Sequence, residues 1–243
     1  MTVGFDAAPA PTSRRLRWIV AAMTVMTFGI GVAVIAFLAS LPTVGDAELR
    51  VHRQLAAHGA TDRAGHVPER IADSIIAVED GAFRTNPGID LRGVIRAILG
   101  GIKGGDDPGG STITQQLAKA LYGGNHGTRA KLKDLGLAVK LNERYSKDQI
   151  MEMYTSVEYF GHGAYGIDAA ARTYFHKSAA NLDWAEASMM AGLLQGPSRL
   201  DPIAHFGAAR SRQRLVLDRL VATQTLTAKA ADAAYAELSS LDR

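Results

Sequence analysis

The chain has 243 residues, of which 47% are hydrophobic, and it carries a formal net charge of +3 and no cysteine. So small an excess of positive charge gives no reason to expect nucleic acid as a partner, and without cysteine the fold cannot depend on disulfide bonds. The length suffices for one domain of ordinary size with an additional segment.

An apolar stretch of 23 residues without a charge occupies positions 19–41. About 20 such residues span the hydrocarbon core of a bilayer, so residues 19–41 are predicted to form a transmembrane helix. Three arginines at positions 14–17 precede it and acidic residues follow, which places residues 1–18 in the cytoplasm and the later chain outside. A cleaved signal peptide with a weak site near Ala39 is the alternative, but its apolar region would be shorter, ~7–15 residues.

Apolar residues at helical spacing and capping residues recur through the rest of the chain. From these signals helices are predicted at 48–58, 68–80, 90–99, 111–122, 129–143, 147–156, 164–175, 183–194, 208–223 and 228–238. Residues 42–66 are interpreted as a stalk, residues 67–243 as the main domain, and only short patches such as 157–160 resemble strands. A mainly α-helical domain on one membrane anchor is expected.

The segment 100–110 contains six glycines in eleven residues. Glycine is conformationally permissive, so this segment is predicted to be mobile. A phosphate-binding loop is the alternative, but the GxxxxGK[ST] spacing and a preceding strand are missing.

Two carboxylates, Glu79 and Asp80, end an otherwise apolar predicted helix. The helix dipole disfavours a carboxylate at a C-terminus, so such a group holds its proton more tightly, which suits a general base. The alternative is an exposed acidic pair without a function.

The motif GGSTITQQLAK opens a helix with polar residues where a core helix would be apolar. With a period of 3.6, Ser111, Gln115 and Lys119 fall on one face. Thr112 and Gln116 lie beside them. Hydroxyls, carboxamides and an ammonium suit a ligand rich in oxygen, such as a sugar or a phosphate, whereas the alternative is a solvated helix start with Ser111 as N-cap.

Seven Lys or Arg fall within residues 119–147, where only Asp134 and Glu143 oppose them. Arg129 and Lys133 are one helical turn apart, and cations around one carboxylate are what a diphosphate site needs. A glycosidase instead needs a second carboxylic acid to protonate a poor leaving group. The excess of cations therefore favours glycosyl transfer from a diphosphate donor over hydrolysis.

Five blocks of the sequence resemble, in order and spacing, the peptidoglycan glycosyltransferases (the GT51 group). They are AVEDGAFRTNPGID (77–90), GGSTITQQLAK (109–119), the basic segment 129–134, SKDQIMEMYTSVEYFGHGAYGIDAAARTYF (146–175) and AEASMMAGLLQGPSRLDP (185–202). The resemblance covers about 67–202, and FHK at 175–177 is similar to the monofunctional members. About 40 residues follow the last block, which leaves no room for a transpeptidase domain.

The resemblance implies a lysozyme-like helical lobe beside a smaller jaw lobe, which residues 42–66 would enter, with a cleft near the membrane. It also implies that Glu79 deprotonates the 4-hydroxyl of the acceptor GlcNAc in lipid II. That oxygen would attack C1 of the MurNAc on the growing lipid-linked glycan, with inversion, and undecaprenyl diphosphate would leave. The implied location is the bacterial inner (cytoplasmic) membrane, with one span and a periplasmic catalytic domain. A transpeptidase or other cell-wall synthesis proteins are the implied partners, without nucleic acid.

By the same resemblance Asp134 is the second catalytic carboxylate, linked to the diphosphate and to a divalent cation, Mg²⁺ or Mn²⁺. No organic cofactor is implied. The positions that match the family's substrate-binding and supporting residues are Asp80, Phe83, Ser111, Thr112, Gln115, Gln116, Lys119, Arg129, Lys131 and Lys133. Among them, Asp80 and Phe83 match residues that support the base.

Four positions depart from the family's pattern. Asn86 replaces a histidine, Ala130 an arginine, Asp134 a glutamate and Thr155–Ser156 a Leu-Asn pair. The shorter carboxylate and the missing arginine both fall on the diphosphate side, where weaker activity is expected. Two other functions stay open: a lytic muramidase, and a non-catalytic protein that binds lipid II or scaffolds other cell-wall proteins.

Overall fold

The computed structural model describes residues 12–60, 65–90, 111–123 and 127–239, in two units, 1–42 and 43–243. The first unit contains α1 (Thr12–Ser40), of which Leu16–Ser40 is long and apolar enough to cross a membrane. Its side chains from Leu16 onward are almost all exposed, as expected of a helix whose surroundings are lipid. The predicted apolar helix is confirmed as a helix, and it begins earlier than predicted.

The second unit is built from helices. These are α2 (Ala47–Ala57), α3 (Glu69–Glu79), α5 (Ile113–Tyr122), α6 (Thr128–Arg144), α7 (Lys147–Val157), α8 (Ile167–Phe175), the short 3-10 helix η1 (Ala179–Asn181), α9 (Trp184–Leu193), α10 (Phe206–Ala222) and α11 (Ala228–Glu237). The only strand-like feature of the described ranges is an isolated bridge between Tyr159 and Tyr165. The expected mainly α-helical class is confirmed, whereas the predicted helix 90–99 and the glycine-rich segment 100–110 lie almost wholly outside the described residues.

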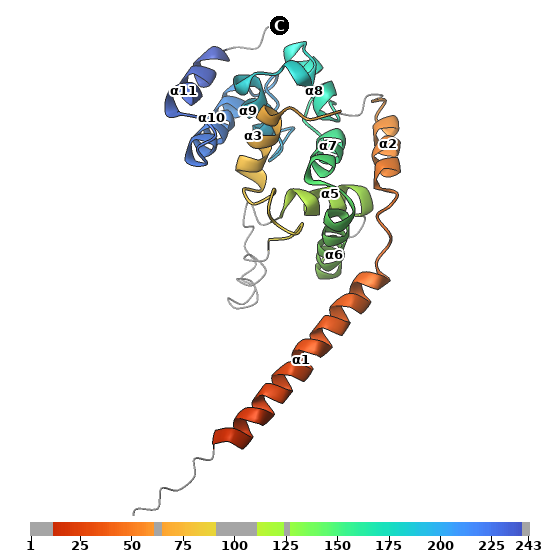
Figure 1. Cartoon of the computed structure of the whole chain (residues 1–243). Helices are drawn as coiled ribbons and strands as arrows, with labels where there is room; N and C mark the ends of the chain where they lie inside the picture. Colours follow the sequence, from red (N-terminus) through yellow and green to blue (C-terminus); the bar gives the residue numbers. More distant parts are fainter. Residues whose placement is uncertain (1–11, 61–64, 91–110, 124–126, 240–243) are drawn as a thin grey trace, which may run out of the picture. The chain divides into compact units, whose positions relative to one another are not determined.

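The helices of the second unit form two groups. One consists of α3, α9, α10 and α11, and the other of α2, α5, α6 and α7. Helix α8 contacts both α7 and α9 and so links them. In Figure 1 the first group consists of gold α3 and the blue helices α9, α10 and α11, and the second consists of orange α2 and the green helices α5, α6 and α7. The two groups meet where α3 ends and α5 begins.

Helix α9 is the centre of the first group, because every residue from Ala185 to Leu193 is buried. A helix that is apolar on all sides must be covered on all sides, and α3 and α10 cover this one. Small residues allow close approach: a Cβ at Gly192 would lie 3.1 Å from Cγ of Arg212 in α10. Packing against the buried helix α9 therefore fixes the position of α3 and of the carboxylate at its end.

The second group includes part of the predicted stalk. Helix α2 is amphipathic, buries Ala47, Val51 and Leu55, and packs against α7 and α5. Its Gln54 side chain donates a hydrogen bond to the carbonyl of Ala120 at 2.7 Å. Residues 43–60 thus contribute to the packing of the second unit.

Helix α8 starts at Ile167, three residues later than predicted. The preceding loop contains Gly161, Gly163 and Gly166, all with positive φ. A side chain at Gly161 would collide with the carbonyl oxygen of Pro197 at 2.7 Å. The backbone there has the positive φ angles that glycine allows. Helix α8 therefore cannot begin until after Gly166.

Candidate functional site

Glu79 is the last residue of α3 and is partly exposed. The Nε2 atom of Gln116, on α5, donates a hydrogen bond to Oε2 of Glu79 at 2.9 Å. Because α3 belongs to one group of helices and α5 to the other, this bond crosses the junction between them. The predicted base therefore lies at the boundary of the two groups, beside the polar helix that the sequence singled out.

Asp80, which is buried, also connects α3 and α5. Its carboxylate, 8% exposed, accepts hydrogen bonds from Nδ2 of Asn86 at 2.9 and 3.0 Å and from the N–H of Ile113 at 3.2 Å. Burial raises the pKa of Asp80, and the bonds from Asn86 and Ile113 work in the opposite direction. A carboxylate is also stabilised at a helix N-terminus. Asp80 thus joins the end of α3 to the first turn of α5.

Asn86, one of the departures from the family pattern, helps to hold Asp80 in place. Its Oδ1 accepts hydrogen bonds from Nζ of Lys147 at 3.1 Å and from the N–H of Gly88 at 3.0 Å. The Lys147 ammonium lies 4.7 Å from the ring centroid of buried Phe83, a cation–π contact. An asparagine is therefore sufficient to hold Asp80, and Lys147 connects it to buried Phe83 in the loop that follows Glu79.

The start of α5 differs from the prediction. The N-cap is Thr112, and Ser111 is exposed and outside the helix, so the alternative in which Ser111 caps it is wrong. The Thr112 hydroxyl accepts from the Gln115 N–H at 3.1 Å, and the Gln115 side chain accepts from the Thr112 N–H at 2.8 Å, which is a capping box. The Thr112 hydroxyl also donates to the carbonyl of Gly88 at 2.6 Å. Gln115 is thus occupied by the cap, and Gln116 is the carboxamide that reaches Glu79.

Tyr154, which the sequence did not single out, fixes the orientation of that carboxamide. Its hydroxyl donates to Oε1 of Gln116 at 2.9 Å, which turns the NH₂ group toward Glu79. Tyr154 is fully buried, and burial raises its pKa well above the usual value, so the hydroxyl stays protonated. Tyr154, Gln116 and Glu79 form one hydrogen-bonded chain through α7, α5 and α3.

A second carboxylate, Glu158, interacts electrostatically with Glu79, and no sequence motif singled it out. It caps the C-terminus of α7, one turn after Tyr154, and is partly buried. Burial first, and then the charge of Glu79, raises the pKa of Glu158 to about 7, against the influence of Lys119. Tyr154 and Glu158 are four residues apart, which puts them on one face at the end of α7. This polar face was the sequence signal by which the two residues could have been found.

Asp134, on α6, is a second carboxylate on which the charge of Lys119 acts. Burial raises the pKa of Asp134, and the ammonium groups of Lys119 and Lys133 lower it. Nζ of Lys133 also donates a hydrogen bond to the carbonyl of Tyr122 at 2.8 Å. The charge of Lys119 therefore lowers the pKa of both carboxylates, Glu158 and Asp134.

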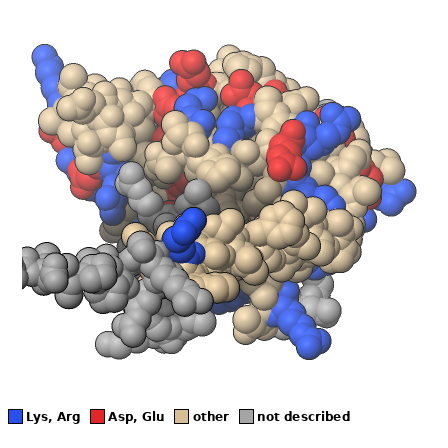
Figure 2. All heavy atoms as spheres, turned by 60° about the horizontal axis from the view of Figure 1, so that its bottom comes forward, with Lys and Arg blue, Asp and Glu red and all other residues tan. Residues whose placement is uncertain are grey.

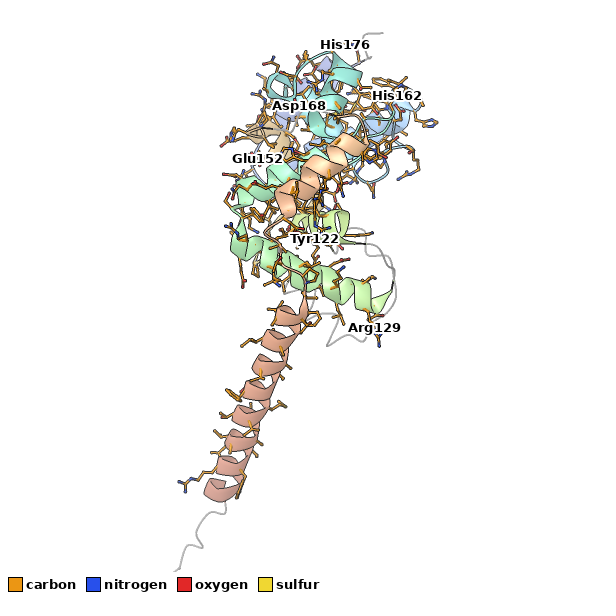
Figure 3. All side chains as sticks on the ribbon, turned by 90° about the vertical axis from the view of Figure 1, so that its right-hand side faces the viewer. Tyr122, Arg129, Glu152, His162, Asp168 and His176 are labelled. Carbon is orange, nitrogen blue, oxygen red and sulfur yellow. The ribbon has the colours of Figure 1, made fainter. Side chains whose placement is uncertain are left out.

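Two of the predicted cations are not gathered at Glu79. Arg129 and Lys131 are exposed near the start of α6. Figure 3 shows Arg129 pointing away from the helices at that end. Their roles in binding stay predictions.

Arg212 adds a cation from α10 that no sequence pattern distinguished from its neighbours. Burial lowers the pKa of Arg212, the charge of Glu79 works in the opposite direction, and the charges of Arg199 and Arg219 lower it further. Its buried Nε atom has no hydrogen-bond partner within the described ranges. A buried guanidinium N–H without a partner is costly, so this group suits an anionic ligand beside Glu79.

The charged side chains of this region come from five helices. They are Arg212 on α10, Glu79 on α3, Glu158 at the end of α7, Lys119 on α5, and Asp134 with Lys133 on α6. Figure 2 shows basic and acidic side chains interspersed over the face it draws, without a broad field of one sign.

The surroundings of Asp134 bear on the expected divalent cation. Its two charged neighbours are ammonium groups, and the described part of the chain contains no group of three or more His, Cys, Asp or Glu that could hold a metal ion. His162, Asp168 and His176 lie at the end of the domain opposite Arg129 (Figure 3). A cation at Asp134 would need most of its oxygen ligands from a bound diphosphate and water, as Mg²⁺ commonly does.

Comparisons with known proteins cover the whole of this site. Residues 50–221 match the family model described as Transglycosylase. Penicillin-binding protein 1A of Mycobacterium tuberculosis (strain ATCC 25618 / H37Rv) is 42% identical over 166 residues, which cover 66% of this chain and 20% of that protein. Penicillin-binding protein 1A of Neisseria gonorrhoeae is 34% identical over 230 residues, which cover 86% of this chain and 29% of that protein.

A similar solved structure is that of penicillin-binding protein 1A from Haemophilus influenzae, with a TM-score of 0.44 and 21% identity, over 73% of this chain and 17% of that one. The chain therefore spans less than a third of the length of these relatives.

Proposed function

The chain belongs to the transglycosylase family, and from this premise we propose that it polymerises lipid II into the glycan strands of peptidoglycan. The observation that carries the proposal is the hydrogen bond between Gln116 and Glu79, on which the charge of Arg212 also acts. The family match at 50–221 includes every residue of that site. The arrangement supports a proposal in which Glu79 is the base and nearby cations stabilise an anionic leaving group.

Glu79 is the proposed general base. One hydrogen bond from Gln116 orients its carboxylate and leaves acceptor capacity for a substrate hydroxyl. In the proposed reaction Glu79 takes the proton of the acceptor 4-hydroxyl while that oxygen forms a bond to C1 of the donor MurNAc. The bond from C1 to the diphosphate oxygen breaks with inversion, and undecaprenyl diphosphate leaves with the electron pair.

Lys119, Lys133 and Arg212 are proposed to hold the diphosphate. A diphosphate is a good leaving group, so the site must stabilise negative charge and need not protonate the departing oxygen. Cations fixed beside the reacting centre do this at little cost in reorganisation. A divalent cation at Asp134, Mg²⁺ or Mn²⁺, stays a proposal and would supply further positive charge to the diphosphate.

The apolar helix α1 suits a lipid-linked substrate. We propose that α1 crosses the cytoplasmic membrane once, with the arginines before it in the cytoplasm and the second unit outside. Enzyme and lipid II would then share one membrane, which raises the rate of encounter. Other cell-wall synthesis proteins, a transpeptidase among them, are the proposed partners.

The experiment is polymerisation of lipid II by the purified full chain in detergent, with and without Mg²⁺. We expect glycan polymer from the natural chain and a fall in rate of ~10²–10⁴ in Glu79→Gln, as is typical for loss of a general base. Glu69→Gln is the matched control, because it removes the same charge from the exposed start of α3. Absence of polymer from the natural chain under both conditions would contradict the proposal.

Hydrolysis of peptidoglycan is the second candidate, and one observation favours it. The pKa of Glu158 is raised to about 7 beside Glu79, and an acid next to a carboxylate is the arrangement of a glycosidase. The cations around the pair favour transfer instead. Release of soluble fragments from purified cell wall would support hydrolysis.

A non-catalytic role in binding lipid II predicts that Glu79→Gln changes neither binding nor cellular function.

A further inference from the structure

The side-chain amide of Gln116 has hydrogen-bond partners at both of its ends. Its Oε1 accepts from the hydroxyl of Tyr154 at 2.9 Å. Its Nε2 donates to Oε2 of Glu79 at 2.9 Å and to the carbonyl of Ser111 at 3.4 Å. An amide has one acceptor end and one donor end, and an ionised carboxylate can only accept. In this orientation of the amide, therefore, all three neighbours meet an end that suits them.

Gln116 cannot hold this orientation by itself. The terminal torsion of a glutamine side chain is broad and roughly two-fold, so its amide can turn over with little change in shape. A turned amide would face the carboxylate of Glu79 with its oxygen, and neither group could donate. Gln116 is also partly exposed, so packing alone does not fix its end. The hydroxyl of Tyr154 supplies the second point of attachment that the amide needs.

Tyr154 is a rigid support for that attachment, because it is fully buried on α7 and α7 packs against α5. The next two residues, Thr155 and Ser156, also carry hydroxyls. Those hydroxyls donate to carbonyls of α7 itself, that of Met151 at 2.8 Å and that of Glu152 at 2.6 Å. Of these three consecutive hydroxyls, the hydroxyl of Tyr154 is thus the one that reaches another helix.

We propose that Tyr154 is a positioning residue for glycosyl transfer, which acts on Glu79 through Gln116. Its hydroxyl holds the amide, and the amide holds Oε2 of Glu79, so that Oε1 is presented to the hydroxyl of the acceptor sugar. This inference rests on the proposed function of Glu79 as the base. A base must lie ~2.6–3.2 Å from the oxygen whose proton it takes, and a misplacement of ~1 Å can cost ~10²-fold in rate.

The test measures kcat and KM for lipid II polymerisation by the full chain. Tyr154→Phe removes the hydroxyl and keeps the ring. We expect kcat to fall by ~10–10²-fold and KM to stay within about twofold, because the position of the base acts on the chemical step. An unchanged kcat in Tyr154→Phe would overturn the inference.

A second background tests whether Tyr154 acts through the amide. Gln116→Leu removes the amide and keeps a side chain of similar volume. In that background Tyr154→Phe should change kcat by less than about twofold, since the path to Glu79 is already broken. A loss of kcat as large as that in the natural chain would show that Tyr154 acts in some other way, and would overturn the inference.

Tyr174→Phe is the matched control. Tyr174, on α8, is 2% exposed, and its hydroxyl donates to the carbonyl of Phe160 at 3.0 Å. This variant therefore also loses a buried hydroxyl and its hydrogen bond, but none that leads to Glu79. Its kcat should equal that of the natural chain. If Tyr174→Phe lowers kcat as much as Tyr154→Phe does, the effect is a general loss of packing and the inference is wrong.

Thermal unfolding separates the inference from the proposed function. Tyr154→Phe leaves Oε1 of Gln116 without its donor, so it should lower Tm in the natural chain and lower it less in Gln116→Leu. Losses in Tm that simply add in the double variant would show that the two residues are not coupled, and would overturn the inference whether or not polymer forms. Coupled losses without polymer from the natural chain would instead contradict the proposed function, on which the role of Tyr154 depends.

Discussion

Replacement of Thr112 by Val should destabilise the chain more than loss of an ordinary helix cap. The Thr112 hydroxyl caps α5 and also donates to the carbonyl of buried Gly88 at 2.6 Å. Loss of the cap costs ~0.5–2 kcal/mol, and a buried carbonyl left without its donor costs ~1–3 kcal/mol. We therefore expect the free energy of unfolding to fall by about 2–4 kcal/mol, because both contributions are lost together.

The measurement is thermal unfolding of the full chain in detergent, followed by circular dichroism. For a domain of this size 1 kcal/mol corresponds to a shift in Tm of about 2–4 °C, so Thr112→Val should lower Tm by about 4–16 °C. Thr112→Ser keeps the hydroxyl and should stay close to the natural chain. Ser146→Ala removes the capping box of α7 at an exposed position and should cost only about 1 kcal/mol.

The comparison between Thr112→Val and Ser146→Ala tests whether the hydrogen bond from Thr112 to Gly88 stabilises the fold. If Thr112→Val is no less stable than Ser146→Ala, the bond to the Gly88 carbonyl contributes nothing, and the connection between the loop after α3 and the start of α5 must be held by Asp80 alone. A larger loss in Thr112→Val assigns the difference to that buried bond.

Two further changes test the site and the loop beside it. Asp134→Glu should preserve or raise polymerisation of lipid II, because it restores the longer carboxylate of the family; loss of turnover would show that the role carried over to Asp134 is wrong. Gly88→Ala should lower the free energy of unfolding by more than Gly59→Ala, as urea titration would measure. Both glycines have positive φ, which costs alanine ~1–2 kcal/mol, but only at Gly88 would the new Cβ lie 2.6 Å from a backbone oxygen, that of Ala138. Equal losses would mean that the loop shifts without cost.

Most of the helices could be predicted because their signals are local. Ser146, Asp183 and Thr227 each cap a helix through a backbone N–H three residues later, so the start can be found from a short stretch of sequence. The start of α5 could not be found this way, since Ser111 and Thr112 both carry a suitable hydroxyl. The bond from Thr112 to Gly88, 24 residues away, distinguishes them in the fold.

The candidate site was predictable to the extent that its residues share a motif. Glu79, Gln116 and Lys119 stood out because polar residues occupied helix positions where a core would be apolar. Tyr154 reaches Gln116 across 38 residues, and Arg212 approaches Glu79 from α10. Contacts of this kind depend on how α7 and α10 pack, which no local pattern encodes.

The buried helix α9 has a consequence for how the chain tolerates mutation. An amphipathic helix such as α6 accepts larger or polar residues on its outer face, so tolerance along it rises and falls with the helical repeat. On α9 every position from Ala185 to Leu193 lies against a neighbour, and added volume in a packed core costs ~1–3 kcal/mol. A saturation scan should therefore find α9 uniformly intolerant, with no periodicity to indicate that it is a helix at all.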